Sequence, residues 1–124
     1  MSLLLDTHTL LWWLTGDRKL SKPARAAIRS EGCLVSAVSL WEIAIKRSLG
    51  RLDADTTEVF EEVRLSDGFA WLPVKPQHVL PVMQLPNHHK DPFDRLLVCQ
   101  AMYERATLVS RDPALRLYDV QVLW

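Results

Sequence analysis

Residues 2–16 read SLLLDTHTLLWWLTG, and this stretch contains the unit from which we predict the fold. The run Ser2–Leu5 is short and apolar, which is typical of a buried strand. The segment Thr7–Thr15 has leucines at helical spacing and is ended by Gly16. A strand that leads directly into a helix is the first half of a β-α-β unit.

The same alternation of short apolar runs and longer amphipathic segments continues along the chain. Further strands are predicted at Cys33–Ser36, Ala70–Val74, Thr107–Ser110 and Val120–Leu123. Further helices are predicted at Ser21–Gly32, Ser39–Leu49, Thr57–Leu65, Pro76–Leu85, Pro92–Arg105 and Pro113–Leu117. This order favours parallel strands joined by right-handed crossovers. The predicted fold class is therefore α/β, a three-layer sandwich with a central parallel sheet of four or five strands.

The length and charge of the chain exclude several classes of protein. Its 124 residues are the size of one domain, so we expect residues 1–124 to form a single domain. Fifteen Lys and Arg residues balance fifteen Asp and Glu residues. This balance excludes a strongly basic protein that coats nucleic acid, and any nucleic acid must be bound at a local site. A hydrophobic content of 48% excludes a disordered chain.

Neither a membrane segment nor a disulfide framework is expected. No stretch reaches the ~18 uncharged apolar residues that a membrane span requires. Asp6 also interrupts the first apolar run before a secretory leader can form. Cys33 and Cys99 lie far apart among apolar neighbours, without zinc-site spacing. We expect a cytoplasmic protein with two reduced thiols and no membrane contact.

Acidic residues stand where predicted strands end or where the following helices begin. Asp6 ends the first predicted strand, and Asp112 follows the fourth. Glu42 lies one turn into the helix after the second strand, while Asp91 and Asp94 open the long helix. Sites in open parallel sheets form outside the carboxyl ends of the strands. We therefore expect these acids to approach one another.

Each acid also has a structural interpretation. Asp91 and Asp112 both precede a proline, which is typical of an N-cap residue with proline at the first helical position. Asp94 then falls at the third helical position, where an acid suits the helix dipole. The spacing of Ser39 and Glu42 matches a capping box. Asp6 is a weaker candidate, since Thr7 beside it is the better cap.

Convergence of the acids would have an electrostatic consequence. Two carboxylates ~5 Å apart repel by roughly 3 kcal/mol at an effective dielectric constant of ~20. Asp6, Glu42, Asp94 and Asp112 can therefore share a pocket only by taking up protons or by binding a cation. Oxygen ligands favour Mg²⁺ or Mn²⁺, which can activate water and stabilise charge on a phosphodiester. The pattern favours a metal-dependent nuclease.

Four blocks of this chain resemble the PIN domain, most closely the VapC-type toxins of bacterial type II toxin–antitoxin systems. The blocks are LLLDTH (3–8) with the following Leu11-Trp12, VSLWEIAIK (38–46), HKDPFDRLLVCQA (89–101) and LVSRD (108–112). The third block is the most specific, and together the four extend over nearly the whole chain. Residues 51–75 carry no signature of the family.

The resemblance implies a ribonuclease that requires Mg²⁺ or Mn²⁺ and acts as a growth-inhibiting toxin. It also implies a homodimer that is inhibited by a VapB-type antitoxin protein. The catalytic and metal-binding acids of the family match Asp6, Glu42, Asp94 and Asp112. Small hydroxyl residues beside them match Thr7 and Ser110, and a further acid of this branch matches Asp91.

Basic and aromatic residues near the acids are candidates for substrate or partner contacts. Arg95 and Lys46, and also Lys90 and Arg111, are positioned to hold RNA phosphates, with ion pairing as the structural alternative. The adjacent His88 and His89 point opposite ways on an extended segment, so we assign them to a loop. Among the tryptophans, Trp41 is expected in the core, and Trp12 or Trp13 at an antitoxin groove.

Two other functions remain open from sequence. An aspartate after the first strand can be a phosphorylated nucleophile, but such enzymes need a second acid close by, and Asp6-Thr7-His8-Thr9 lacks one. A non-catalytic binding module of the same fold is the other alternative. A module of that kind has no need for four mutually repelling acids.

Overall fold

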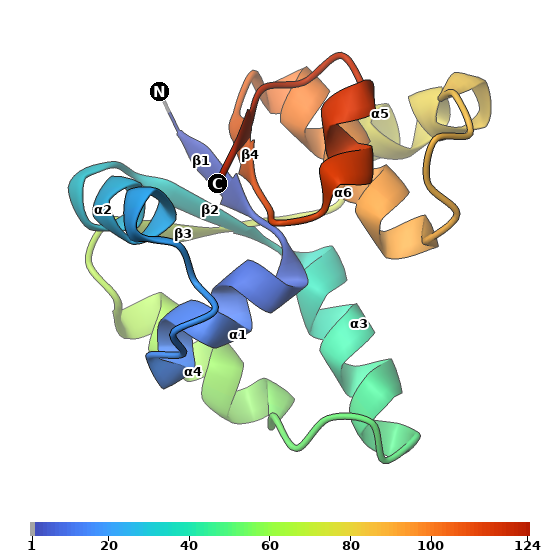
Figure 1. Ribbon diagram of the computed structural model, residues 1–124. Helices are drawn as coiled ribbons and strands as arrows, with labels where there is room; N and C mark the ends of the chain where they lie inside the picture. The colour runs from blue at the N-terminus through green and yellow to red at the C-terminus, as the bar shows by residue number, and fades with distance from the viewer. Residues whose placement is uncertain (1) are drawn as a thin grey trace.

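The structure is a computed structural model that describes residues 2–124 (Figure 1). The strands are β1 (Leu3–Leu5), β2 (Cys33–Ser36), β3 (Phe69–Leu72), β4 (Thr107–Val109) and β5 (Val122–Leu123). The α-helices are α1 (Thr7–Thr15), α2 (Lys22–Ser30), α3 (Ala37–Ser48), α4 (Thr56–Leu65), α5 (Pro76–Val79) and α6 (Pro92–Glu104). Two 3₁₀ helices complete the fold, η1 (Leu80–Gln84) and η2 (Pro113–Leu117).

The five strands form one parallel sheet in the order β3-β2-β1-β4-β5. The first strand lies at the centre, where Leu5 is level with Val35 of β2 and Val109 of β4. After β1, the chain adds β2 and β3 on one side of it and then returns to add β4 and β5 on the other side. The carboxyl end of β1 is therefore the place where an open α/β sheet forms its site.

Successive side chains of the central strand pack alternately into two separate hydrophobic cores. Leu3 and Leu5 pack in one core, together with Ile28 of α2 and Val63 of α4. Leu4 packs in the other, which includes residues of α6. Side chains of a strand point to opposite faces in turn, so an uninterrupted apolar run is the signature of a strand covered on both sides.

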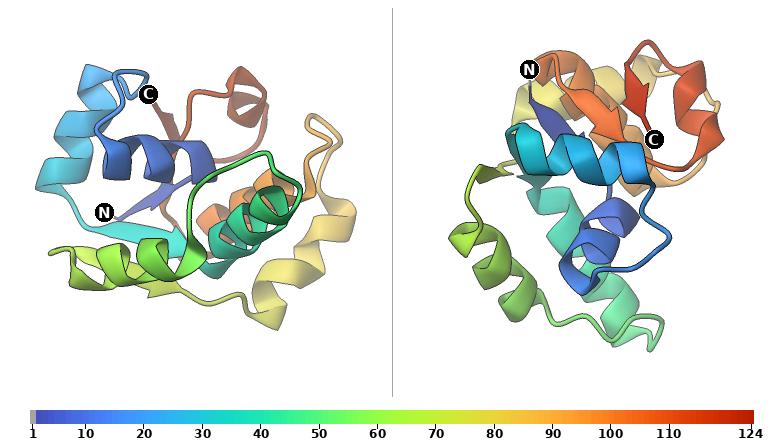
Figure 2. Two further views of the ribbon diagram at one scale, coloured as in Figure 1. Left: turned by 90° about the horizontal axis from the view of Figure 1, so that it is seen from below. Right: turned by 60° about the vertical axis from the view of Figure 1, so that its left-hand side comes forward.

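The helices accordingly form a layer on each face of the sheet. Helices α1, α2 and α4 lie on one side, and α5 and α6 lie on the other (Figures 1 and 2). Helix α3 contacts both layers, since Val38 belongs to the core with α6 and Ile43 to the core with α1. The prediction of a three-layer α/β sandwich is confirmed. No helix within residues 2–124 is long and apolar enough to cross a bilayer.

The N-cap of helix α3 lies three residues earlier than predicted, and the helix itself begins two residues earlier. Ser36, not Ser39, is the N-cap, and its hydroxyl accepts a hydrogen bond from the Val38 N–H at 3.0 Å. The strand β2 passes into the helix without a turn, so the capping position falls on the last strand residue. Ser39 is instead buried inside the helix, and the predicted capping box of Ser39 and Glu42 is wrong.

Trp41 was predicted in the core and is instead 58% exposed. The buried positions of α3 are Val38, Ser39, Glu42 and Ile43, so Trp41 lies on the opposite side of the helix. Its ring meets Phe93 of α6 edge-on, with centroids 5.1 Å apart. The predicted helix at 76–85 is likewise divided, into α5 and the tighter η1.

The two faces of α6 provide a test of this packing. Leu97 is fully buried, whereas Met102 on the same helix is 43% exposed. We expect Leu97→Ala to lower the free energy of unfolding by about 2–5 kcal/mol, and Met102→Ala to change it by less than about 0.5 kcal/mol. Denaturant unfolding measures both, and equal losses would contradict the assigned packing.

Candidate active site

An open cavity of about 480 Å³ lies at the carboxyl edge of the sheet. Four aspartates from three separate segments line it, namely Asp6, Asp91, Asp94 and Asp112. His8, Trp12, His89, Arg111 and Pro113 complete the wall. The predicted convergence of acids therefore holds for Asp6, Asp94 and Asp112, while Glu42 lies behind the wall and does not line the cavity.

Asp6 is fixed at the junction of β1 and α1. It is the N-cap of α1, and its Oδ1 accepts a hydrogen bond from the Thr9 N–H at 2.9 Å. Thr7, which the sequence favoured as the cap, points instead toward Ser39 and Glu42. Burial raises the pKa of Asp6, and hydrogen bonds from Ser110 and Thr9 offset only part of this effect.

Asp91 and Asp94 belong to the first turn of α6. Asp91 is the N-cap, and its Oδ1 accepts hydrogen bonds from the N–H groups of Phe93 and Asp94, at 2.8 and 3.2 Å. Burial raises the pKa of Asp94 to about 7, and the negative charges of Asp91 and Asp6 add to this increase. Burial and the neighbouring acids thus favour the protonated form of Asp94.

Asp112 begins η2 and is held from two sides. Its Oδ1 accepts a hydrogen bond from the Ala114 N–H at 2.9 Å, and its Oδ2 lies 2.7 Å from His89 Nε2. Burial alone would raise the pKa of Asp112, but the hydrogen bonds from Ala114 and His89 outweigh it and lower the pKa. Asp112 is therefore ionised at a pH where Asp94 still carries a proton.

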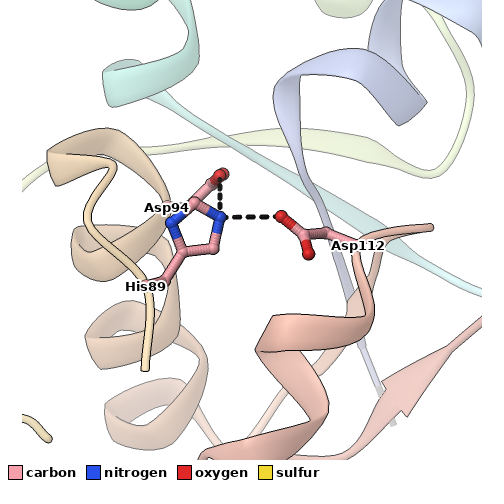
Figure 3. A group of neighbouring side chains, drawn as sticks. All are labelled: His89, Asp94 and Asp112. Carbon is pink, nitrogen blue, oxygen red and sulfur yellow. Dashed lines mark hydrogen bonds and ion pairs between the residues drawn. The ribbon is translucent and has the colours of Figure 1, made fainter. Parts of the chain in front are cut away.

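His89 joins the acids of α6 and η2, a position that the sequence did not indicate (Figure 3). Its Nδ1 accepts a hydrogen bond from the Asp91 N–H at 3.0 Å. A neutral ring then carries its proton on Nε2, which lies 2.7 Å from Asp112 Oδ2 and 3.2 Å from Asp94 Oδ2. His89 is thus a donor that links two carboxylates. The only signal in the sequence is its place just before the capping pair Asp91-Pro92.

Glu42 forms a second polar layer behind the cavity. It is 4% exposed, accepts a hydrogen bond from Thr7 Oγ1 at 2.6 Å, and forms an ion pair with Lys46 one turn further along α3. Its negative charge contributes to the raised pKa of Asp94, so the two groups interact electrostatically. Lys46, a predicted phosphate contact, is engaged by Glu42 rather than exposed in the cavity.

Arg95 lies on α6 but is not part of the cavity wall. Its guanidinium donates to the backbone carbonyls of the segment that precedes the helix, with 2.9 Å to Pro86 O and 3.1 Å to Leu85 O. It also donates to Val82 O and His89 O, both at 3.3 Å. The structure therefore gives Arg95 a task in shaping the loop that carries His89, and its predicted contact with RNA phosphate stays a prediction.

The donor set of the cavity fits a hard divalent cation. One ligand atom from each of His89, Asp94 and Asp112 lies within 4.8 Å of the other two. The carboxylate oxygens of Asp94 and Asp112 are the ligands that Mg²⁺ and Mn²⁺ prefer, and His89 contributes the third atom of the group. Burial is the main cause of the raised pKa of Asp94, and the negative charges of Asp91, Asp6 and Glu42 add a repulsion that a bound cation would relieve.

Comparison with known proteins identifies relatives of the whole chain. The family model described as PIN domain matches residues 3–121. The chain is 27% identical over 117 residues to Ribonuclease VapC22 of Mycobacterium tuberculosis. The matched region is 93% of this chain and 90% of that protein.

Solved structures share the fold at low sequence identity. VapBC2 from Rickettsia felis, solved bound to a DNA fragment from its promoter, has a TM-score of 0.71 at 13% identity, covering 99% of this chain and 98% of that chain. VapC20 of Mycobacterium tuberculosis, described as a Sarcin-Ricin loop cleaving toxin, has a TM-score of 0.66 at 14% identity and covers 93% of both chains. These likenesses confirm the predicted fold.

The link made by His89 can be tested with two amides. In His89→Asn the amide keeps an acceptor near the Nδ1 position but has no donor that reaches the carboxylates. In His89→Gln the amide nitrogen reaches the Nε2 position. We expect His89→Asn to destabilise the metal-free protein by about 1–3 kcal/mol, and His89→Gln by less than half as much. Denaturant unfolding in EDTA measures this, and equal losses would contradict the link.

The raised pKa of Asp94 predicts a pH-dependent gain from Asp94→Asn. The folded chain holds the Asp94 proton up to pH about 7, whereas an ordinary aspartate loses it near 3.8. The stability that comes from this proton is present below pH 3.8 and is lost as the pH rises through 7. Asn does not ionise, so above pH 7 the metal-free variant should exceed the parent by up to roughly 4 kcal/mol. Thermal unfolding across this range should show the difference vanish in acid; a constant difference would contradict it.

Proposed function

Since the PIN domain model spans nearly all of the sequence, the chain belongs to the PIN domain family, and we propose on this premise that it is a metal-dependent endoribonuclease. The observation that carries the proposal is the convergence of Asp6, Asp94 and Asp112 on one cavity. Asp6 precedes Asp94 by 88 residues and Asp112 by 106 residues, and the parallel sheet brings the three acids to one edge. The similarity to a protein named Ribonuclease VapC22 points to the same activity.

Asp6, Asp94 and Asp112 are the residues that would hold Mg²⁺ or Mn²⁺, directly or through water. The bound cation would activate a water molecule and stabilise the charge that develops on the phosphodiester. Asp94 would release its proton when it binds the cation, because the positive charge replaces the proton between the acids. His89 would keep Asp112 oriented through Nε2–H, in the way that outer ligands orient the carboxylates of metal sites.

Residues behind the cavity would tune its charge. Thr7 and Lys46 hold Glu42 in place, and the charge of Glu42 adds to the negative potential that attracts a cation. Ser110 supports Asp6 by a hydrogen bond. From its place behind the cavity, Glu42 would complete the acidic site and help to orient the attacking water. Attack by water would leave a 5′-phosphate on the RNA product.

We further propose that the protein is the toxin of a toxin–antitoxin pair, with a VapB-type antitoxin as its partner. The support is the name of the relative and the fold shared with toxin–antitoxin complexes, such as VapBC-1 from nontypeable Haemophilus influenzae. Residues 1–124 would act as one PIN-like domain, as a homodimer, in the cytoplasm where its RNA substrate is found. A non-catalytic module is the alternative that a cleavage assay excludes.

Removal of a single carboxylate tests the proposed nuclease. We expect Asp6→Asn and Asp94→Asn each to lower Mn²⁺-dependent cleavage of structured RNA by at least about 100-fold, since each removes charge that holds the cation. EDTA should abolish cleavage by the parent protein. Asp119→Asn is a matched control, because Asp119 is exposed and does not line the cavity.

A binding measurement in the same variants separates loss of metal from loss of folding. At a concentration one hundred times its Kd, Mn²⁺ should raise the free energy of unfolding of the parent by about 2.7 kcal/mol, and that of the two cavity variants by much less. Denaturant unfolding with and without Mn²⁺ measures the difference. Cleavage that survives in EDTA, or that persists in both variants while they remain folded, would rule out the metal-dependent nuclease.

A further inference from the structure

Arg111 presents an unpaired positive charge at the rim of the acidic cavity. It follows β4, next to Asp112, and its side chain is exposed while it lines the cavity. Its guanidinium carbon lies 4.8 Å from the centroid of the Trp12 ring, which is the geometry of a cation–π contact. Trp12 comes from α1, so the contact joins α1 to the segment that follows β4.

Among the described residues that line the cavity, Arg111 is the only lysine or arginine, and its guanidinium has no acceptor. Within residues 2–124 it forms neither a hydrogen bond nor an ion pair, although Asp112 is its neighbour in the chain. Arg95, by contrast, donates to backbone carbonyls, and Lys46 pairs with Glu42. Contact with the face of an aromatic ring leaves the N–H edges of a guanidinium free, and these edges match the oxygens of a phosphate.

The Trp12 ring is itself held in place. His8 stacks on it with centroids 5.6 Å apart and planes 20° apart, and Trp124 meets it at 5.8 Å with planes tilted by 60°. Lys19 Nζ is 6.0 Å from the centroid of the same ring, at the outer limit for a cation–π contact, and does not line the cavity. Arg111 therefore contacts a ring that is itself packed against His8 and Trp124.

We propose that Arg111, supported by Trp12, binds a backbone phosphate of the RNA adjacent to the phosphate that is cleaved. This inference rests on the proposed nuclease function and adds a substrate-binding site to it. Four aspartates repel an incoming polyanion, so an unpaired cation at the same cavity supplies attraction that the acids do not. A carboxylate of a partner protein could meet the same guanidinium, but RNA is favoured because its phosphates recur along the chain on both sides of the cleavage site.

Binding of single-stranded RNA at several salt concentrations tests the assignment. The background is Asp94→Asn, in which cleavage is expected to be at least about 100-fold slower and the repulsion in the cavity is lower. Fluorescence anisotropy of a short labelled single-stranded RNA gives log Kd against log salt. Loss of one phosphate contact in Arg111→Gln should weaken binding and reduce the magnitude of the slope by about 0.7. Arg111→Lys should retain most of the slope, since Lys keeps the charge.

Control variants identify what the change in slope means. Arg29→Gln removes the same charge from an exposed position on α2 that does not line the cavity, and should leave the slope unchanged. Trp12→Phe should preserve binding, while Trp12→Leu should weaken it. Because Arg111 is exposed, its variants stay informative even if Trp12→Leu fails to fold.

The possible results separate this inference from the proposed function. Parent protein that cleaves RNA, with Arg111→Gln and Arg29→Gln binding alike, would overturn the phosphate site but leave the nuclease intact. Weaker binding with an unchanged slope would overturn it as well, because a phosphate contact releases counterions. Absence of both RNA cleavage and RNA binding by the parent would instead reject the nuclease and this inference together. A purified antitoxin that loses affinity for Arg111→Gln while RNA binding is unchanged would identify a protein contact in place of RNA.

Discussion

Three of the four cavity carboxylates are fixed by the same hydrogen bond. In Asp6, Asp91 and Asp112, the Oδ1 atom accepts backbone N–H groups from the first turn of the helix that follows. Each carboxylate thus satisfies a helix terminus with Oδ1, and in Asp112 the second oxygen faces His89. Capping and the proposed metal binding are therefore compatible in Asp6 and Asp112, because the cap fixes the orientation of the carboxylate.

The remaining constraint on the cavity is its negative charge. Asp94 does not cap a helix, and its pKa of about 7 reflects burial and its acidic neighbours. Asp112 shows the opposite behaviour, because backbone and imidazole donors stabilise its charge. Neighbouring carboxylates in one cavity are in this way brought to different protonation states, with His89 between them. Binding of a divalent cation with release of the Asp94 proton would raise the local charge by one unit rather than two.

The sequence predicts the sheet and most of the cavity because both depend on local patterns. The run Leu3–Leu5 identifies a strand buried on both faces, and the Asp-Pro pairs locate two helix starts with their acids. Errors arose where a distant contact decides the outcome. Trp41 faces outward because α3 turns Glu42 and Ile43 inward. His89, correctly predicted in a loop, meets Asp112 through a contact that only the fold creates. Neither contact leaves a periodic signal in the chain.

Arg95 illustrates how a residue can matter to a site that it does not line. Its guanidinium gathers the carbonyls of residues 82, 85, 86 and 89, and so fastens the connection between η1 and α6 to the helix that carries Asp94. The His89 imidazole and the Asp94 carboxylate are consequently held by one connected part of the chain. Asp112 lies on a separate segment. A genetic screen that scores only growth inhibition would thus group Arg95 with the acids, although the two kinds of defect have different structural origins.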